Sequence, residues 1–130
     1  MNTLISISRD GRFSAVAADD GSADVLHVSD VAAQSRLGGL LDRPAVRLRV
    51  DGFSDGRGFS VARLLRLQGF SGVIEIIGDL LPDQLPMAVA SGVDAIVICG
   101  EHAERCDESQ WRRKAADKNR FGYQRLVAGV

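Results

Sequence analysis

After residue 24 the chain alternates between short apolar runs and segments of helix length, and this alternation limits the possible folds more than any other feature. The apolar runs predict strands over residues 24–29, 45–50, 72–79 and 93–99. The last run, VDAIVIC, is nearly continuous, as expected for a strand that is covered on both faces. Strands that alternate with helices form right-handed βαβ units around a parallel sheet. We therefore predict an α/β fold with a mainly parallel sheet flanked by helices.

A β-hairpin is predicted before the alternating region. Asp10-Gly11 separates two runs of alternating apolar residues, and this dipeptide favours a type I′ turn because both of its residues tolerate positive φ. A chain of 130 residues suits a single domain. We divide this domain, residues 1–130, into an N-terminal hairpin at residues 1–22 and βα units with a C-terminal helix and tail at residues 23–130.

Prolines and glycines indicate where the helices begin and end. Proline is tolerated in the first turn of a helix but not in its interior. Pro82 and Pro86 therefore place a helix start between them, with Asp83 as N-cap and Gln84 as the first helical residue. The helices are predicted over residues 31–41, 59–68, 84–91 and 101–119, with Gly69 and Gly92 ending the second and third.

Composition and charge argue against several classes of protein. The formal net charge of -1 predicts neither a nucleic-acid binder nor an acidic tail. No apolar run reaches the roughly 20 residues that a membrane span needs, and the first residues lack the layout of a signal peptide. Two cysteines make no disulfide framework, so we expect a reduced, cytoplasmic protein.

The segment 111–125 carries six basic residues and one acidic residue. We interpret it as the solvated face of a terminal helix, because such a run more often faces solvent than nucleic acid. Trp111, Phe121 and Tyr123 are expected to anchor the helix and tail to the body of the protein or to a second subunit. We predict a homodimer that uses the C-terminal helix or a sheet edge.

Polar residues follow the predicted parallel strands at their carboxyl ends, where ligands of α/β proteins usually bind. We call this edge of the sheet the rim, and five residues are expected to lie along it: Asp55, Arg57, Asp79, Glu101 and His102. The stretch SDGRG combines glycine amides, a guanidinium group and a following helix, which are the elements of an anion site. It also fits a tight turn in which Gly56 or Gly58 has positive φ and Asp55 caps the helix. The residues by themselves leave both interpretations open.

Metal and cofactor binding are not expected. Cys99, His102 and Cys106 lie near one another in sequence, but a structural zinc site takes four ligands and a fourth is not evident. The chain carries no dinucleotide fingerprint. The best motifs contain no histidine or lysine, which argues against acid–base catalysis.

Four stretches resemble the landmarks of an uncharacterised bacterial family: FSDGRGFSVARLLR, GDLLPDQL, GVDA and YQ near the end. Members of that family are described as oxidoreductases involved in sulfite reduction, because their genes tend to lie beside sulfite reductase genes. The resemblance covers residues 25–124 and is most specific at residues 53–66 and 78–85. The residues that match are Phe53, Asp55, Gly56, Arg57, Gly58, Ser60, Ala62, Arg63, Leu65, Arg66, Gly78, Asp79, Asp83, Gln84, Gly92, Asp94, Tyr123 and Gln124.

The chain also departs from the family pattern. Glu75 stands where relatives usually have a basic residue, and Pro82 and Ala90 stand where they tend to have arginine. Ser91 and Val93 replace a cysteine and a phenylalanine. Fewer basic groups on the rim imply a ligand preference that differs from that of the relatives.

Three functions are consistent with the residues and the resemblance. The first is an accessory protein of sulfite or sulfate assimilation that binds a small anion or a partner enzyme at the rim. The second is an enzyme, an oxidoreductase by the family's description, with its chemistry on Asp55, Arg57 and Asp79. The third is a structural module that dimerises. For the first, Arg57 is expected to pair with Asp79 or Asp55 in the free protein, and the expected ligand-binding residues are Asp55, Gly56, Arg57, Gly58, Ser60, Asp79, Asp83 and Gln84.

Overall fold

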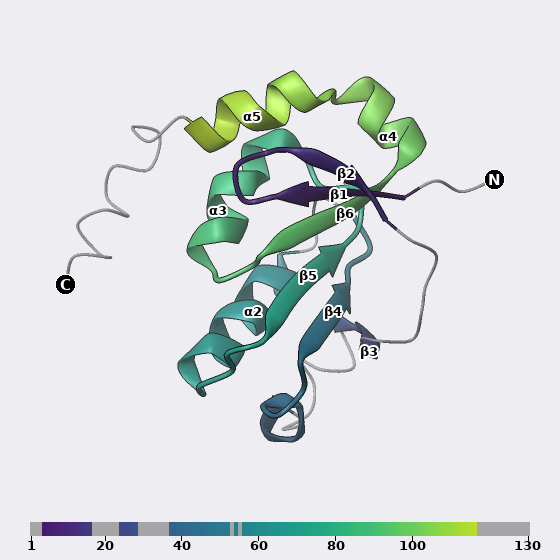
Figure 1. Cartoon of the computed structure of the whole chain (residues 1–130). Coiled ribbons are helices and arrows are strands. Elements are labelled where there is room, and N and C mark those ends of the chain that lie inside the picture. The colour runs from purple at the N-terminus through teal and green to yellow at the C-terminus, as the bar shows by residue number, and fades with distance from the viewer. Residues whose placement is uncertain (1–3, 17–23, 29–36, 53, 55, 117–130) are drawn as a thin grey trace.

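The computed structural model has a single six-stranded sheet with helices packed against it (Figure 1). The structure describes residues 4–16, 24–28, 37–52, 54 and 56–116. The strands are β1 (Leu4–Ser8), β2 (Phe13–Ala15), β3 (Asp24–His27), β4 (Ala45–Arg49), β5 (Val73–Ile77) and β6 (Ala95–Cys99). Their order across the sheet is β2-β1-β6-β5-β4-β3. Strands β3 to β6 are mutually parallel, and β1 is antiparallel to both β2 and β6. The predicted α/β fold with an N-terminal strand pair is confirmed.

The helices of the described residues are the 3-10 helix η1 (Leu37–Leu40), α2 (Arg57–Leu67), the 3-10 helix η2 (Pro82–Gln84), α3 (Leu85–Ala90), α4 (Gly100–Arg105) and α5 (Glu108–Ala116). Strands β3 to β6 follow one another across the sheet in chain order. Right-handed connections between strands in this order place their helices on the same face, and Figure 1 shows α2 and α3 on one side of the sheet. Among the helices described, none combines the length and the apolar character needed to cross a membrane.

The core lies between the sheet and these helices. In β4, Val46 and Leu48 are fully buried, while Arg47 and Arg49 lie on the other face, as the two-residue period of a strand requires. The predicted alternation is therefore confirmed. In β6 the three consecutive residues 96–98 are all buried, as predicted for a strand that is covered on both faces.

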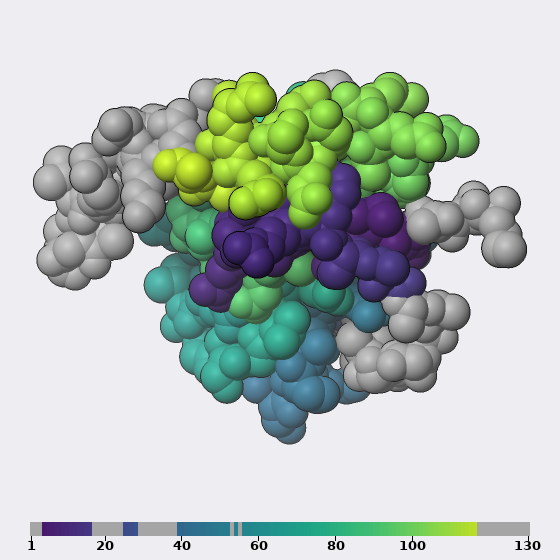
Figure 2. All heavy atoms as spheres, turned by 45° about the horizontal axis from the view of Figure 1, so that its top comes forward, coloured from purple at the N-terminus to yellow at the C-terminus, as the bar shows by residue number. Residues whose placement is uncertain are grey.

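Helix α5 packs against the β1–β2 hairpin, and Figure 2 shows the two elements in contact at the surface. Trp111 on α5 is 0% exposed, and its indole Nε1–H donates a hydrogen bond to the Cys106 carbonyl at 2.9 Å. From the hairpin, the Phe13 N–H donates to Glu108 Oε2 at 2.9 Å. Trp111 thus anchors the helix to the body of the protein, which is one of the two alternatives predicted.

The hairpin turn differs from the predicted type I′ turn. The loop between β1 and β2 has four residues, from Arg9 to Arg12, and the Ser8 N–H donates to the Arg12 carbonyl at 3.0 Å. Gly11 has a φ of 84°, but Asp10 does not adopt positive φ. Only one residue of the dipeptide therefore needs the left-handed region, because the longer loop closes the hairpin without a second one.

The helix boundaries near the prolines also differ from the prediction. Asp83 lies within η2 and does not cap a helix, and α3 begins at Leu85. The Gln84 side chain accepts a hydrogen bond from the Leu81 N–H at 2.8 Å and so takes over the capping of this turn. Pro86 lies in the first turn of α3, as predicted.

The predicted helix over residues 101–119 is interrupted, and α4 and α5 are separate helices. Asp107 causes the break, because its Oδ1 atom accepts hydrogen bonds from the Ser109 hydroxyl at 2.7 Å and from the Gln110 N–H at 3.2 Å. These bonds cap a new helix start. Residues 117–119 lie outside the described residues. In the predicted helix over residues 31–41, the structure describes the 3-10 helix η1, while residues 31–36 lie outside.

Arg66, near the end of α2, ties together the loops at the amino ends of β5 and β6. Its guanidinium group donates hydrogen bonds to the carbonyl oxygens of Phe70 at 2.9 Å, Gly72 at 2.8 Å and Gly92 at 3.0 and 3.1 Å. It also pairs with the Asp94 carboxylate at 2.8 Å. We call these five residues the Arg66 cluster. The cluster lies at the end of the sheet opposite the predicted rim, so its role is to hold the loops in place.

Candidate functional site at the carboxyl ends of the parallel strands

The segments after β4, β5 and β6 lie at one end of the sheet. Strand β5 pairs in parallel with both β4 and β6, so the carboxyl ends of the three strands are neighbours. The loop before α2 follows β4, Asp79 follows β5, and α4 follows β6. The predicted rim therefore brings these three segments to the same edge.

The two glycines of the SDGRG stretch have different structural roles. Neither has positive φ, so the predicted left-handed turn at Gly56 or Gly58 is wrong. Gly56 is the N-cap of α2 with a φ of -76°, and a Cβ atom added there would meet nothing within 4 Å. Gly58 is buried, and a Cβ there would lie 2.8 Å from Val50 Cγ1 and 3.2 Å from Ile76 Cδ1. Gly58 is thus required for the close packing of α2 on the sheet.

Arg57, the first residue of α2, has a side chain that is 48% exposed. Its guanidinium lies 3.7 Å from Oδ2 of Asp51, which directly follows β4. The other Asp51 oxygen lies 2.9 Å from Nε2 of His27, the last residue of β3. A carboxylate between an imidazole and a guanidinium therefore occupies this corner of the rim. Ser60 is exposed in the next turn of α2.

The expected ion pair between Arg57 and Asp79 is not formed. Asp79 is turned toward β6, where its carboxylate accepts hydrogen bonds from the Cys99 N–H at 3.0 Å and from the Cys99 thiol at 3.3 Å. Asp79 therefore ties the end of β5 to the end of β6. The alternative partner, Asp55, lies outside the described residues, as does Phe53.

His102 lies on α4 and is 6% exposed, so it does not reach the surface of the rim. Its Nε2 atom lies 2.6 Å from the Leu80 carbonyl oxygen. A carbonyl can only accept, so Nε2 carries the proton. Within the described residues, no group of three His, Cys, Asp or Glu side chains is arranged to hold a metal.

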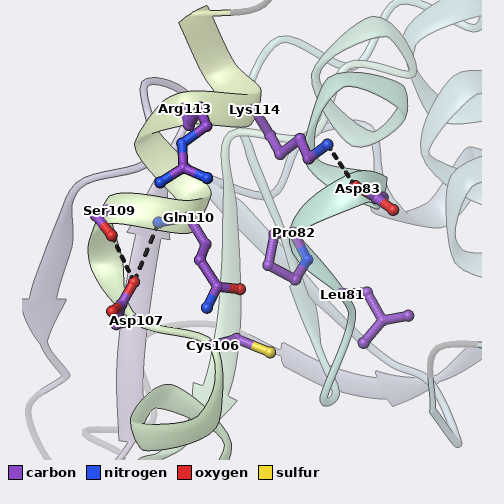
Figure 3. A pocket seen from close by; sticks show the side chains of 9 residues that line it. All are labelled: Leu81, Pro82, Asp83, Cys106, Asp107, Ser109, Gln110, Arg113 and Lys114. Carbon is purple, nitrogen blue, oxygen red and sulfur yellow. Dashed lines mark hydrogen bonds and ion pairs between the residues drawn. The ribbon is translucent and has the colours of Figure 1, made fainter.

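Asp83 lies apart from Arg57, beside a pocket of about 500 Å³ between η2 and the start of α5 (Figure 3). Its Oδ1 atom pairs with Lys114 Nζ at 2.9 Å across this pocket. Gln110 and Arg113 of α5 line the same pocket, and Cys106 lies at its lower end in Figure 3. The predicted site residues that the structure describes therefore do not form one site. Some lie at the start of α2 and Asp83 lies at this pocket, while Asp79 ties β5 to β6 and Gln84 caps η2.

Sequence reasoning missed two kinds of residue. His27 and Asp51 were not predicted at the rim. Asp51 directly follows the predicted strand 45–50, which was a usable signal, whereas His27 lies inside the predicted strand 24–29 and ends β3 only in the structure. Arg113 and Lys114 were interpreted as part of a solvated helix face, and no role was predicted for Gln110. Their spacing of three and four residues places them on one face of α5, but only the fold shows that this face lies opposite η2.

A family model described as "Bacterial protein of unknown function (DUF934)" matches residues 25–129. No curated protein and no solved structure matches the chain. The match begins at Val25 in β3, so β1 and β2 lie before the matched region. Because the family model covers most of the 130 residues, the chain belongs to this family of bacterial proteins of unknown function.

Proposed function

We propose that the protein is an accessory binding protein, which holds a small anion or an acidic group of a partner enzyme at the start of α2. The observation that carries this proposal is the carboxylate of Asp51 beside the Arg57 guanidinium, at 3.7 Å. The presence of the Asp51 carboxylate indicates that the position beside Arg57, at the start of α2, suits a negatively charged group. An anion from outside can reach the same neighbourhood, because the side chains of Asp51 and Arg57 are 71% and 48% exposed.

The backbone around Arg57 supports anion binding. Helix α2 has 11 residues and no acidic side chain in its first turn, so the positive end of its dipole is not offset by a carboxylate there. The space around Gly56 is open on the side where a Cβ atom would lie. An anion can therefore approach the first N–H groups of the helix while the guanidinium binds it from the side.

A binding role agrees better with the contacts of the rim than acid–base catalysis does. The proposed catalytic group of Asp55, Arg57 and Asp79 requires Asp79 to face Arg57. Both carboxylate oxygens of Asp79 instead accept hydrogen bonds from Cys99. We therefore rank the binding protein above the oxidoreductase that the sequence resemblance implies. The same resemblance makes sulfite and sulfate the first anions to test.

Changing Arg57 to alanine should weaken anion binding by about tenfold or more, since a charge-assisted hydrogen bond contributes roughly 1.5–3 kcal/mol. Folding should change by at most about 1 kcal/mol, because an exposed ion pair stabilises little. Calorimetric titration of the wild-type and variant proteins with sulfite, sulfate and phosphate measures the first effect, and urea unfolding measures the second.

The matched control is Arg63→Ala, since Arg63 is also exposed on α2 but lies away from its first turn. This control should bind every anion as the wild type does. If Arg57→Ala binds all anions and all captured partner proteins as tightly as Arg63→Ala does, the proposed function is wrong.

The homodimer stays a prediction, but Trp111 no longer supports it because its side chain is buried. Trp111 packs inside its own chain, while Phe121 and Tyr123 lie outside the described residues. A dimer that uses the C-terminal tail should therefore depend on Phe121 and Tyr123. Light scattering at micromolar concentration should give twice the chain mass of 13.9 kDa, and Phe121→Ser with Tyr123→Ser should give the chain mass. A wild-type protein with the mass of a single chain would refute the dimer.

A further inference from the structure

The pocket between η2 and α5 is separate from the start of α2, and its walls differ in chemical character (Figure 3). Leu81 and Pro82 form an apolar wall on the side of η2. On the side of α5, Gln110, Arg113 and Lys114 recur at helical spacing and line the opposite wall. The volume of about 500 Å³ is in the range of small-ligand sites, roughly 300–1,000 Å³.

Most charges around the pocket are already compensated. Lys114 pairs with Asp83 at 2.9 Å. Asp107 accepts hydrogen bonds from the Ser109 hydroxyl and from the Gln110 N–H. These bonds lower the pKa of its carboxyl group from the ordinary value. Asp107 therefore stays ionised as the cap of α5 and does not need a further partner.

Among the described residues, Arg113 forms no direct salt bridge, although its charge lies near enough to Asp107 to help lower the pKa of that carboxyl group. Figure 3 shows its guanidinium pointing toward the space beside Gln110. Gln110 likewise makes no side-chain hydrogen bond within the described part of the chain, although its backbone N–H is bonded to Asp107. Arg113 and Gln110 thus both line the pocket from α5, with the Gln110 amide pointing toward Cys106, and Leu81 and Pro82 line it from the side of η2.

We propose that this pocket binds a carboxylate that is attached to a short aliphatic chain. The planar guanidinium of Arg113 matches the two oxygens of a carboxylate and can bind both at once. The Gln110 amide can donate to the same group or to a neighbouring carbonyl. Leu81 and Pro82 provide apolar surface for the aliphatic chain. The proposal uses no residue of the α2 site, so the failure of either proposal leaves the other intact.

The test uses butyrate as the probe and Arg113→Gln as the variant. Butyrate should shift the amide NMR signals of residues 81–83 and 106–114 in a saturable way, with a dissociation constant on the order of 1–10 mM for so small a ligand. The variant should weaken this binding about tenfold. Arg112→Gln is the matched control, because Arg112 is the preceding exposed arginine of the same helix and does not line this pocket. It should bind butyrate as the wild type does.

A second measurement uses the reactivity of Cys106, which lines the pocket and is half-buried. In a Cys99→Ser background, bound butyrate should slow the alkylation of Cys106 by iodoacetamide, and Arg113→Gln should abolish this protection. Acetate and butanol, which lack the chain and the carboxylate respectively, should protect less. Equal loss of binding in Arg112→Gln and Arg113→Gln, or shifts that do not saturate, would overturn the proposal.

The carboxylate could belong to a free acid or to the C-terminus of a protein, and a further probe distinguishes the two. This probe is the peptide N-acetyl-alanyl-leucine, whose C-terminal leucine carries both a carboxylate and an aliphatic chain. Binding of the peptide about tenfold tighter than butyrate indicates the C-terminus of a protein, because the peptide adds contacts beyond the carboxylate. Tighter binding of butyrate indicates a free acid. Arg113→Gln should weaken whichever probe binds, and a variant that binds both as the wild type does contradicts the site.

Discussion

Replacing Arg66 with methionine is expected to lower the free energy of unfolding by about 3 kcal/mol, because a half-buried charge pair is broken and its acceptors lose their donor. The Arg66 side chain is 26% exposed, and its five hydrogen bonds reach three carbonyl groups and one carboxylate. Methionine keeps the apolar stem that packs on the protein, so the change removes the donors with little loss of packing.

Asp94 makes the expected effect larger than that of a single ion pair. Its Oδ2 atom accepts hydrogen bonds from Arg66 at 2.8 Å and from the Ile74 N–H at 2.9 Å, and its other oxygen pairs with Arg9. One carboxylate therefore connects α2, β5 and the start of the hairpin turn. Gly92 belongs to the same arrangement, since a Cβ atom there would lie 2.5 Å from Arg66 Cγ.

Urea unfolding followed by the fluorescence of Trp111 measures the effect, because this is the single tryptophan of the chain and it is fully buried. The melting temperature should fall by about 10 °C for a loss of this size. Arg63→Met is the control on the same helix, with an exposed side chain, and it should change stability by at most about 0.5 kcal/mol. Arg66→Lys should lie between the two, since an ammonium group cannot reproduce the planar fork. Equal stability of Arg66→Met and Arg63→Met contradicts a stabilising role for the Arg66 cluster.

The strands and their faces could be predicted from sequence because their signals are local. The alternation of Val46 and Leu48 with arginines is visible within six residues, and it determines which face of β4 is buried. The break before α5 was also visible in principle, because Asp107 followed by Glu108 and Ser109 is a typical helix start. The predicted helix over residues 101–119 ran across this signal.

The contacts of the rim could not be predicted in the same way, because each joins residues that are distant in the chain. Asp79 contacts Cys99, 20 residues later, and His27 contacts Asp51, 24 residues later. Which carboxylate faces which partner depends on the order of β3 to β6 in the sheet. The sequence suggested Asp79 as the partner of Arg57, since both follow strands, but the neighbouring strand end at Cys99 competes for that carboxylate.

The residues on which the sequence resemblance rests lie at both ends of the sheet. Arg66, Gly92 and Asp94 belong to the Arg66 cluster, which holds loops together. Asp79 and Gly58 hold β5 to β6 and α2 to the sheet. Arg57 differs from them, since its side chain is half-exposed and its contact to Asp51 is long. Of these residues, Arg57 is therefore the one whose side chain is best placed for binding.

Replacing Gly58 with valine is expected to destabilise the protein by about 3 kcal/mol, through overpacking of a site that has no space for a side chain. A Cβ atom would already lie 2.8 Å from Val50 Cγ1 and 3.2 Å from Ile76 Cδ1. Val50 is 6% exposed and Ile76 is 1% exposed, so neither side chain can move aside into solvent. The two further methyl groups of valine must push α2 away from the sheet.

Gly56→Val is the control within the same stretch of sequence, because a side chain at Gly56 meets nothing within 4 Å. Since Gly56 has a φ of -76°, valine should cost at most about 1 kcal/mol there. Gly58→Ala should fall between the two valine variants, because the gain in helix propensity of about 1 kcal/mol opposes the close contact of its Cβ atom. Urea unfolding of the three variants measures this order. If Gly58→Val and Gly56→Val are equally stable, α2 does not depend on close approach to β4 and β5. The binding proposal predicts the opposite order for anion affinity. Among folded molecules, Gly56→Val should bind anions more weakly than Gly58→Val, because a valine at Gly56 blocks the open approach to the first amides of α2 and leaves the fold intact.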